Sequence, residues 1–468
     1  MKFERSNEAK QAEIDRVRRG PLDPYLALRL PRYRLYVMGR NVSGIGDAMQ
    51  SIVVSWELYA RTHNPMILGW VGLVQVAPVL LFAIPAGHVA DQYSRKTVAI
   101  VAQSVFTLCT LVLAALSWTH AAIPLFYLCL FCGMTARAFG NPARAALLPQ
   151  IVTTAQLGNA ISWDTSIRRL AVMSGQALGG YLLEFSGKPT FARLLPAFAA
   201  SARTVSSTHR AGQPLFAIPA VVYLTTATLG TLGVLLLCAI KLNSDVNVAD
   251  RLRKTAVTWE TLIGGIRYIR SNRIILETIT LDLFAVLFGG ATALLPIYQK
   301  EILHVGPEGL GWLRASSSLG ALVMALATAH LPPIRKPGAA MLWAVTGFGV
   351  ATVVFGLSKD MRVSLIALAC LGALDMISVV VRQTLIQTLT IDEMRGRVNA
   401  VNAIFINSSN EIGAFESGLA ARIGGTVFSV VSGGIASVIV AVGASVKWPA
   451  LRSYDIYHRG NSTPDGPQ

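Results

Sequence analysis

The sequence has 468 residues, of which 53% are hydrophobic and 14% charged, with a formal net charge of +16 and a mean hydropathy of +0.51. Soluble domains carry about 25% charged residues, so this composition excludes an ordinary soluble protein and indicates a membrane protein. The positive charge could suggest nucleic acid. However, the cations fall in loops and tails beside hydrophobic runs, where anionic headgroups are their natural neighbours, so we expect a lipid bilayer and no nucleic acid as partner.

Twelve hydrophobic runs follow along the chain, each near the ~20 residues that a helix needs to cross a bilayer. A chain in lipid must satisfy its own backbone hydrogen bonds, so all twelve are predicted to be helices and the fold is predicted to be all-α. The predicted spans are 35–60, 66–90, 96–118, 121–141, 158–185, 215–241, 274–299, 310–331, 339–358, 362–390, 398–422 and 425–447.

The runs divide the chain into five parts. These are a cytoplasmic N-terminal segment 1–34, a six-helix bundle 35–241, a cytoplasmic linker 242–273, a second six-helix bundle 274–447 and a cytoplasmic tail 448–468. In the linker, WETLIGGIRYIRSNR (259–273) has apolar residues at helical spacing among basic ones. This predicts an amphipathic helix at the membrane interface, with a partner-binding helix as the alternative. The polar tail is expected to be disordered.

Two patterns occur in both bundles. Pro-x-x-Leu-Gly-Trp stands at 65–70 and at 307–312, and RAALLPQIVTTAQLGNA from Arg144 resembles RQTLIQTLTIDEMRGRVNA from Arg382 at nearly the same offset. They indicate a duplication with both copies in the same direction. Two six-helix halves related by an axis along the membrane normal are one common transporter plan, which binds substrate near the middle of the membrane between the halves.

Lysine and arginine predict the orientation. Segment 1–34 holds nine of them and segment 241–273 holds seven, and further ones in alternate loops are Arg95, Lys96, Arg335, Lys336, Arg395 and Arg397. By the positive-inside rule both termini are cytoplasmic, and the basic loop 186–214 on the far side is an exception. The first 33 residues are too polar for a cleavable signal peptide, so the first span is expected to direct the chain to a bacterial inner membrane.

The turn after the second span reads GHVADQYSRKTV, with the skeleton Gly87-x3-Asp91-x3-Arg95-Lys96. Glycine lets two helices meet closely, and a neighbouring helix N-terminus would stabilise the carboxylate at 91. The two cations can pair with acids. Such contacts exist only while the halves are closed on this side, so they would bias an equilibrium between two states.

This turn resembles the gating signature of the major facilitator superfamily. The runs LFGGATALLPIYQKEILHVGPEGLGWLRASSSLGA and MRGRVNAVNAIFINSSNEIGAFESGLAA resemble its exporter branch, which includes enterobactin exporters and macrolide efflux pumps. The resemblance implies the twelve-helix major facilitator fold with two pseudo-symmetric bundles. Gln92 replaces the family's usual Arg, and no acid occurs from 92 to 163, so Asp392 or Glu393 is the expected partner of Arg95. Antiporters of the superfamily often carry Gly-Pro-x-x-Gly-Gly in span five, and here Gln176 stands in place of the proline.

Ionisable residues inside the spans need a partner, a cavity or a function, because each costs about 2.5–3.5 kcal/mol to insert. Asp47 lies on a polar stripe of the first span with Gln50 and Ser51, and this stripe is predicted to face a central cavity. Glu57 is expected to meet water at the outer end of the same span. Proton coupling needs a deep carboxylate that gains and loses a proton near neutral pH, and Asp47 and Glu411 are the candidates.

The two repeats place charges at matching positions. Arg137 and Arg144 are two helical turns apart in span four, as are Asp375 and Arg382 in span ten. The first of each pair is predicted to face the cavity and the second to brace the cytoplasmic end. Other cavity candidates are Asp164, which could pair with Arg168, and Asp282, Arg314, Asn407 and Asn410. The other bracing candidates are Asp392, Glu393, Arg395 and Arg397. For any one of these residues, an ion pair that only holds helices together is the alternative.

The chain has no G-x4-G-K-[ST] phosphate loop and no histidine cluster, so no enzyme activity, cofactor or metal site is expected. The expected function is secondary active transport by a monomer. A proton gradient would drive the export of a small organic substrate, a siderophore or drug-like amphipathic compound, by alternating access. A carrier of lysophospholipid or another lipid is one alternative. A non-transporting receptor or scaffold is the other, and the charges inside the spans argue against it.

Overall fold

The computed structural model describes residues 25–188, 190, 218–240, 259–330 and 334–454, and these residues form helices without any strand. A helical segment is present at each of the twelve predicted spans. Eight of the described helices are long and apolar enough to cross a membrane, and Met66–Phe82 is apolar but shorter. Three further long helices, α2 (Pro31–Thr62), α6 (Thr154–Ser186) and α17 (Asp392–Gly424), are not among these eight and carry several charged residues. The expected all-α membrane fold is confirmed.

The first half contains six helices: α2 (Pro31–Thr62), α3 (Met66–Gln92), α4 (Arg95–Trp118), α5 (Ile123–Ile151), α6 (Thr154–Ser186) and α9 (Ile218–Ala239). Local sequence explains their starts. Ser94 accepts a hydrogen bond from the backbone of Thr97 to cap α4, and Thr153 and Gln156 form a capping box on α6. The predicted end of span four at residue 141 is wrong, because α5 continues through Pro142 and Pro149 to Ile151.

The second half begins with α11 (Trp259–Ser271) and α12 (Arg273–Phe288) and continues through a 3-10 turn (Gly290–Leu294), α13 (Leu295–Ile297) and a π turn (Tyr298–Ile302). The predicted span 274–299 is found as one candidate span, Arg273–Ile302, but its helix is not α-helical throughout, because the α-helix ends at Gly289 and Gly290 begins the 3-10 turn. The remaining helices are α14 (Pro307–His330), α15 (Pro337–Leu357), α16 (Met361–Leu389), α17 (Asp392–Gly424), α18 (Thr426–Lys447) and α19 (Pro449–Ser453).

The linker and the tail are partly described. The amphipathic segment forms α11, whose Gly265 and Ile269 are buried against the second half, and Tyr268 donates a hydrogen bond to the carbonyl of Leu389. The tail was expected to be disordered, but its first residues form α19, and Leu451 is fully buried beside α15. The segment 1–24, the loop 191–217, the linker 242–258 and the tail 455–468 lie outside the described residues.

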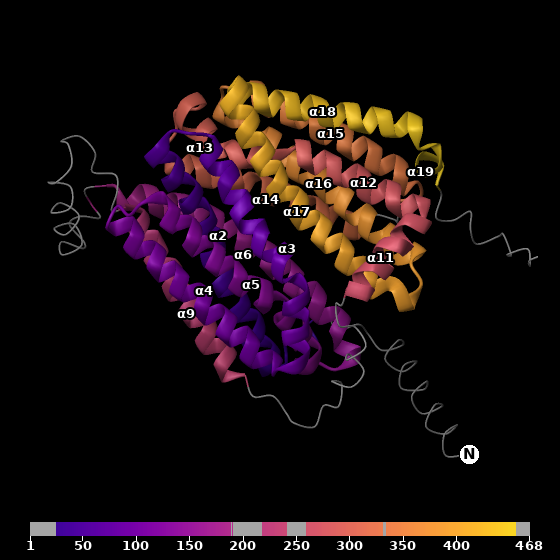
Figure 1. Cartoon of the computed structure of the whole chain (residues 1–468), viewed down its shortest axis with the longest axis horizontal. Helices are drawn as coiled ribbons and strands as arrows, with labels where there is room; N and C mark the ends of the chain where they lie inside the picture. Colours follow the sequence, from indigo (N-terminus) through magenta and orange to yellow (C-terminus); the bar gives the residue numbers. More distant parts are fainter. Residues whose placement is uncertain (1–24, 189, 191–217, 241–258, 331–333, 455–468) are drawn as a thin grey trace, which may run out of the picture.

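The helix contacts repeat between the halves, as a duplication requires. In the first half α2 contacts α6 and α9, α4 contacts α5 and α9, and α3 contacts α5. In the second half α12 contacts α17 and α18, α15 contacts α16 and α18, and α14 contacts α16. Between the halves α3 lies along α17 and α6 lies along α14, and exchanging the halves converts one pair into the other. In Figure 1, α3 and α17 lie side by side where the indigo and magenta half meets the orange and yellow half.

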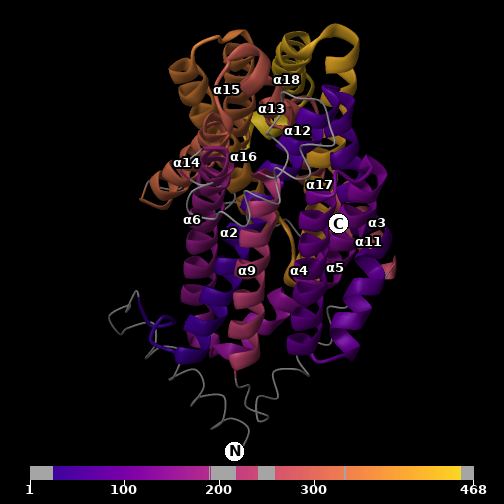
Figure 2. The same ribbon diagram turned by 90° about the vertical axis from the view of Figure 1, so that its left-hand side faces the viewer.

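The two ends of the molecule differ in how the halves meet. We call the end with Arg95, Lys96, Arg395 and Arg397 the basic face and the other end the opposite face. One buried apolar cluster joins α2, α3 and α6 to α13 and α14 near the opposite face. Toward the basic face the buried side chains form separate clusters, one in each half. Among the described side chains, a buried apolar cluster therefore joins the halves near the opposite face, and none of the clusters toward the basic face spans both halves. In Figure 2, α9, α4 and α5 of the first half stand in front.

Candidate functional site

An ion pair lines a pocket in the middle of the first half. Asp47 on α2 pairs with Arg137 on α5, whose guanidinium carbon also lies 4.2 Å from the centre of the Phe106 ring. The side chains of Asp47 and Arg137 are 21% and 25% exposed, so the pair is neither fully buried nor free in solvent. Gln50 and Ser51 of the polar stripe also line this pocket.

A second charged layer lies one to two turns closer to the basic face. Arg40 binds the carboxylate of Asp164 at 2.7 Å and donates to the Tyr36 hydroxyl at 3.1 Å. The Tyr36 hydroxyl in turn donates to the backbone carbonyl of Arg144. The predicted pair between Asp164 and Arg168 is wrong, because the partner comes from α2 and Arg168 is exposed. Asp164 is buried, so the layer holds α2, α5 and α6 together.

Arg144 belongs to the same layer, but no ion pair to it is present among the described side chains. It is 9% exposed, and its Nε and one Nη are buried without a hydrogen-bond partner. The guanidinium lies over Gly140, where a Cβ would come within 3.2 Å of it. Asp47, Arg137 and Arg40 all act on it electrostatically. Arg144 therefore lies inside the bundle near the Asp47–Arg137 pair, deeper than a brace at the helix end.

In the second half, Arg382 and Asp282 form a buried ion pair between α16 and α12, and Ser378 donates to Asp282 at 2.8 Å. Arg382 is 2% exposed and Asp282 4% exposed. Asp282 was a cavity candidate, but its carboxylate is occupied by this pair at the edge of a small pocket that Asp375 also lines. Arg169 on α6, across the boundary between the halves, acts on Asp375 electrostatically.

The boundary between the halves contains Arg314 and Glu411. Arg314 on α14 donates to Ser51 at 3.1 Å and to Ser55 at 3.4 Å, both on α2 of the other half. Glu411 on α17 lies against α3, where a Cβ on Gly72 would be 3.2 Å from its carboxylate. Arg314 acts on Glu411 electrostatically, but no ion pair in contact with Glu411 is present among the described residues.

Two other cavity candidates on α17 are not brought into this group. Asn407 and Asn410 are exposed, and the Asn410 amide donates to the carbonyl of Ile406 on its own helix. Of the candidates on α17, Glu411 therefore lies at the boundary between the halves, while the two asparagines are exposed.

The gating motif makes contacts inside its own half. Gly87 is buried, Arg95 donates to the carbonyl of Ala146, and Lys96 donates to the carbonyls of Cys238 and Ile240. The side chains of Asp91, Asp392 and Glu393 lie outside the described residues. On the other half, Arg395 donates to the carbonyl of Gln387, and Arg397 is exposed beside Gly264 of α11.

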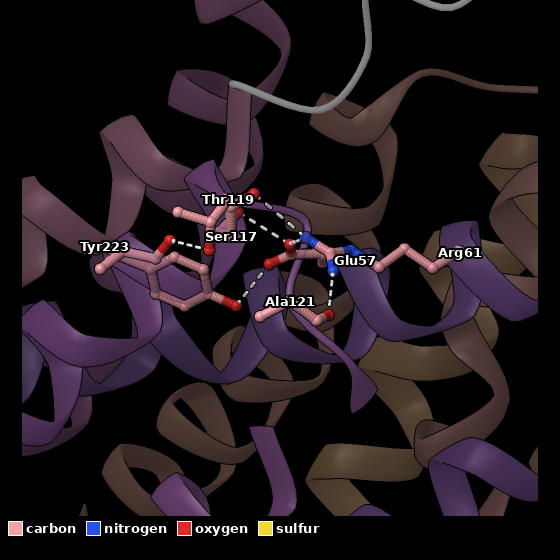
Figure 3. A network of polar contacts seen from close by, with 7 residues as sticks. Glu57, Arg61, Ser117, Thr119, Ala121 and Tyr223 are labelled. Atoms are coloured by element: carbon pink, nitrogen blue, oxygen red, sulfur yellow. Dashed lines mark hydrogen bonds and ion pairs between the residues drawn. The ribbon is translucent and has the colours of Figure 1, made fainter. Parts of the chain in front are cut away.

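A network around Glu57 fixes the first half near the opposite face (Figure 3). Glu57 is 1% exposed and accepts hydrogen bonds from Arg61 at 2.5 Å, Ser117 at 2.7 Å and Tyr223 at 2.9 Å. Arg61 also donates to the carbonyls of Ser117 and Ala121. The expectation that Glu57 meets water is wrong, because α4 and α9 cover it. The network joins α2, α4 and α9.

Contacts between the halves close the opposite face. Tyr59 donates to Glu301, and Lys300 lies 2.8 Å from the ring of His63. Glu184 on α6 accepts a hydrogen bond from the backbone N–H of Glu308 in the first turn of α14. A helix N-terminus favours a carboxylate, so this contact is stabilised by the dipole of a helix in the other half.

Small residues let the backbones touch at the same closure. A Cβ on Gly180 would lie 2.7 Å from backbone atoms of Gly311, so α6 and α14 approach too closely there for any side chain. The sequence did not predict this contact between Gly180 and Gly311. Arg40, Arg169 and Glu184 were not among the predicted site residues. All three are charged residues inside predicted spans, so the rule that such charges need partners could have identified them.

The sequence is similar to a known protein family and to several of its members. The family model of the Major Facilitator Superfamily matches residues 37–414. The enterobactin exporter EntS of Citrobacter koseri is 26% identical over 375 residues, which cover 79% of this chain and 80% of that protein. The staphyloferrin A transporter of Staphylococcus aureus is 26% identical over 148 residues, 31% of this chain and 37% of that protein, so this match spans little more than a third of that relative.

Solved structures share the fold. A bacterial homolog of the human lysosomal transporter Spinster, inward-facing and occupied, has a TM-score of 0.67 at 15% identity, covering 93% of this chain and 100% of that one. A bacterial homologue of the iron transporter ferroportin, in an inward-facing state, has a TM-score of 0.63 at 16% identity, covering 91% and 99%. The family model matches most of the chain and the fold agrees, so the chain is a multi-pass membrane transporter that belongs to the major facilitator superfamily.

Proposed function

We propose that the chain is a proton-driven exporter of a siderophore or drug-like amphipathic compound and works by alternating access. The observation that carries this proposal is an asymmetry between the two ends of the described structure. Buried apolar side chains join the halves near the opposite face, whereas toward the basic face the described clusters stay within one half and charged side chains such as Asp47 and Arg137 lie inside the spans. The basic face is cytoplasmic in this proposal, as the positive-inside rule favours, so the described state receives cargo from the cytoplasm. The likeness to an enterobactin exporter supports a siderophore as cargo.

Glu411 is the stronger of the two candidates for proton coupling. A carboxylate in contact with a cation is held in its charged form, whereas a desolvated carboxylate without such contact takes up a proton more readily. Asp47 is paired with Arg137, while Glu411 lies at the boundary with Arg314 acting from beyond contact. In the proposed cycle, a proton from outside binds Glu411 when the opposite face opens, and release to the cytoplasm resets the carrier.

Two sets of contacts alternate in this cycle. The contacts of Tyr59 with Glu301 and of Glu184 with α14 break as the opposite face opens. In exchange, Arg95 leaves its present contact, and Asp91 and Arg95 latch the basic ends together. Arg95 now binds a carbonyl of its own half, so it is available for this exchange without breaking an ion pair among the described contacts.

Transport by purified protein in liposomes tests the proposal. With the basic face outward, an acidic lumen should drive accumulation of a radiolabelled siderophore or of a fluorescent drug-like dye, and collapsing the pH gradient should stop it. Accumulation unaffected by the gradient would refute proton drive. Movement of a fluorescent lysophospholipid, with neither soluble compound transported, would favour a lipid carrier instead. No movement of any of the three would refute transport of the proposed classes.

A further inference from the structure

The first half holds an excess of positive charge at membrane depth. Between the Glu57–Arg61 pair and the basic face, its described spans carry more arginines than acids: Arg40, Arg137, Arg144, Arg168 and Arg169 against Asp47 and Asp164. Each of these aspartates is in contact with one arginine, so three arginines have no described acid of their own half in contact. The corresponding region of the second half is acidic: Asp282, Asp375, Glu411 and Glu416 outnumber Arg314 and Arg382.

Arg144 is the arginine whose position is hardest to explain by packing alone. An uncompensated buried charge costs several kcal/mol, and a guanidinium presents donors in a fork that fits two oxygens of one anionic group. Two of the three nitrogens of Arg144 are buried without a partner. Gly140 leaves the space that the guanidinium fills, so an alanine there would crowd it. The site provides donors and lacks an acceptor.

The neighbouring pocket supplies the other half of an amphipathic site. Phe106, Leu113 and Met134 line it together with the Asp47–Arg137 pair. A ligand with an anionic end and an apolar body would place the body against these side chains and the charge toward the arginines. A cationic group would instead meet like charges, which favours an anion over a cation in this half.

We infer that the cargo carries an anionic oxygen group and that Arg144, together with Arg137, binds this group. The inference rests on the proposed function, because it names the chemistry of the same cargo. Asp47 then serves as a built-in counter-ion: it pairs with Arg137 while the site is empty and gives way when the anionic group arrives. This role differs from proton coupling, which stays with Glu411.

Binding to the purified full chain in lipid nanodiscs tests the inference without any transport. The soluble probe is citrate, with its neutral trimethyl ester as the matched control at equal ionic strength. The lipid probe is lysophosphatidylglycerol, with monoacylglycerol as its neutral counterpart. Each anionic probe that matches the cargo should raise Tm, and the neutral counterpart should not. A response to citrate alone identifies a soluble anionic cargo, and a response to the lysolipid alone identifies a lipid one.

Variants of Arg144 separate binding from folding. Arg144→Met removes an unpartnered buried charge, so it should raise the Tm of the empty protein while weakening anion binding about ten- to hundredfold. Arg144→Lys should keep part of the affinity, and the exposed Arg362→Gln should change neither property. If Arg144→Met lowers the Tm of the empty protein and leaves anion binding intact, the arginine is structural and the inference is wrong. Equal responses to sodium chloride and to citrate, or to charged and neutral probes, would also overturn it.

The outcomes separate this inference from the proposed function. Proton-coupled transport that prefers cationic cargo, with no effect of Arg144→Met, would refute the anionic cargo and leave the exporter proposal standing. Anion binding that depends on Arg144, in a protein that ignores the pH gradient, would refute proton drive and leave the binding site standing.

Discussion

Neutralising Glu57 should destabilise the first half strongly. Glu57→Gln keeps the size of the side chain but leaves Arg61, whose side chain is 10% exposed, without its counter-charge. Removing one partner of a buried pair costs about 3–5 kcal/mol. Polar contacts between helices in membranes average only about 0.6 kcal/mol, because the unfolded chain in lipid also finds partners. The charge term dominates here, so we expect a loss of about 3 kcal/mol in the free energy of unfolding, measured in mixed micelles of increasing sodium dodecyl sulfate content.

An exposed pair with the same spacing gives the control. Lys188 and Glu184 are also four residues apart, but their charged atoms are 3.7 Å apart and the side chains are 52% and 29% exposed. Lys188→Gln should therefore cost less than about 1 kcal/mol. The double variant Glu57→Gln with Arg61→Gln should recover part of the loss, because no lone charge remains buried. A Glu57→Gln cost no larger than that of Lys188→Gln would refute the reasoning from burial.

Four further substitutions test the site and the closures. Gly180→Ala should prevent closure of the opposite face, because a Cβ there lies 2.7 Å from the neighbouring backbone, while Gly44→Ala, with nothing within 4 Å, should not. Accessibility of a single cysteine introduced at the opposite face measures this, and equal labelling of the two variants would contradict it. Glu411→Gln should abolish the response of transport to the pH gradient while sparing exchange of cargo for cargo, and an unchanged response would remove Glu411 as the coupling site. Asp47→Asn should tighten binding of an anionic probe about tenfold, because about 1.4 kcal/mol of competition for the arginine is removed, and weaker binding would contradict the counter-ion role. Asp91→Asn should lower transport with little change in the amount of protein in the membrane, and full activity would refute the latch.

The positions of the spans could be predicted from hydrophobic runs because lipid forces nearly every apolar stretch into a helix. The boundaries failed where local signals are ambiguous. Pro142 and Pro149 resemble the end of a helix in soluble proteins, but α5 passes through both, since neighbouring helices and local adjustment satisfy the freed backbone groups in a membrane protein. In span seven, the paired glycines at 289 and 290 end the α-helix, but they lie inside an apolar run, so hydrophobicity gives no signal of this change.

The candidate site was predicted less well than the fold. Hydrophobic periodicity places a charge on a helix face but does not identify the helix that the face meets. The i, i+4 rule paired Asp164 with Arg168, yet the contact comes from Arg40 on another helix. The repeats predict equivalent depths for Arg137 and Asp375. The sequence does not show that Arg137 pairs with Asp47, or that Arg169 acts on Asp375 across the boundary between the halves. Contacts between distant segments follow from packing, which one sequence does not specify.

The unmatched Arg144 also has an electrical consequence. A charge that moves across the whole membrane potential changes in energy by about 2.3 kcal/mol per 100 mV. In the proposed cycle, the guanidinium groups of the first half are exposed first to one side of the membrane and then to the other. Because they carry uncompensated charge, the membrane potential favours one of these two states. An inside-negative potential would hold the empty carrier with these groups facing inward, and an anion bound to them would cancel the charge and release that hold.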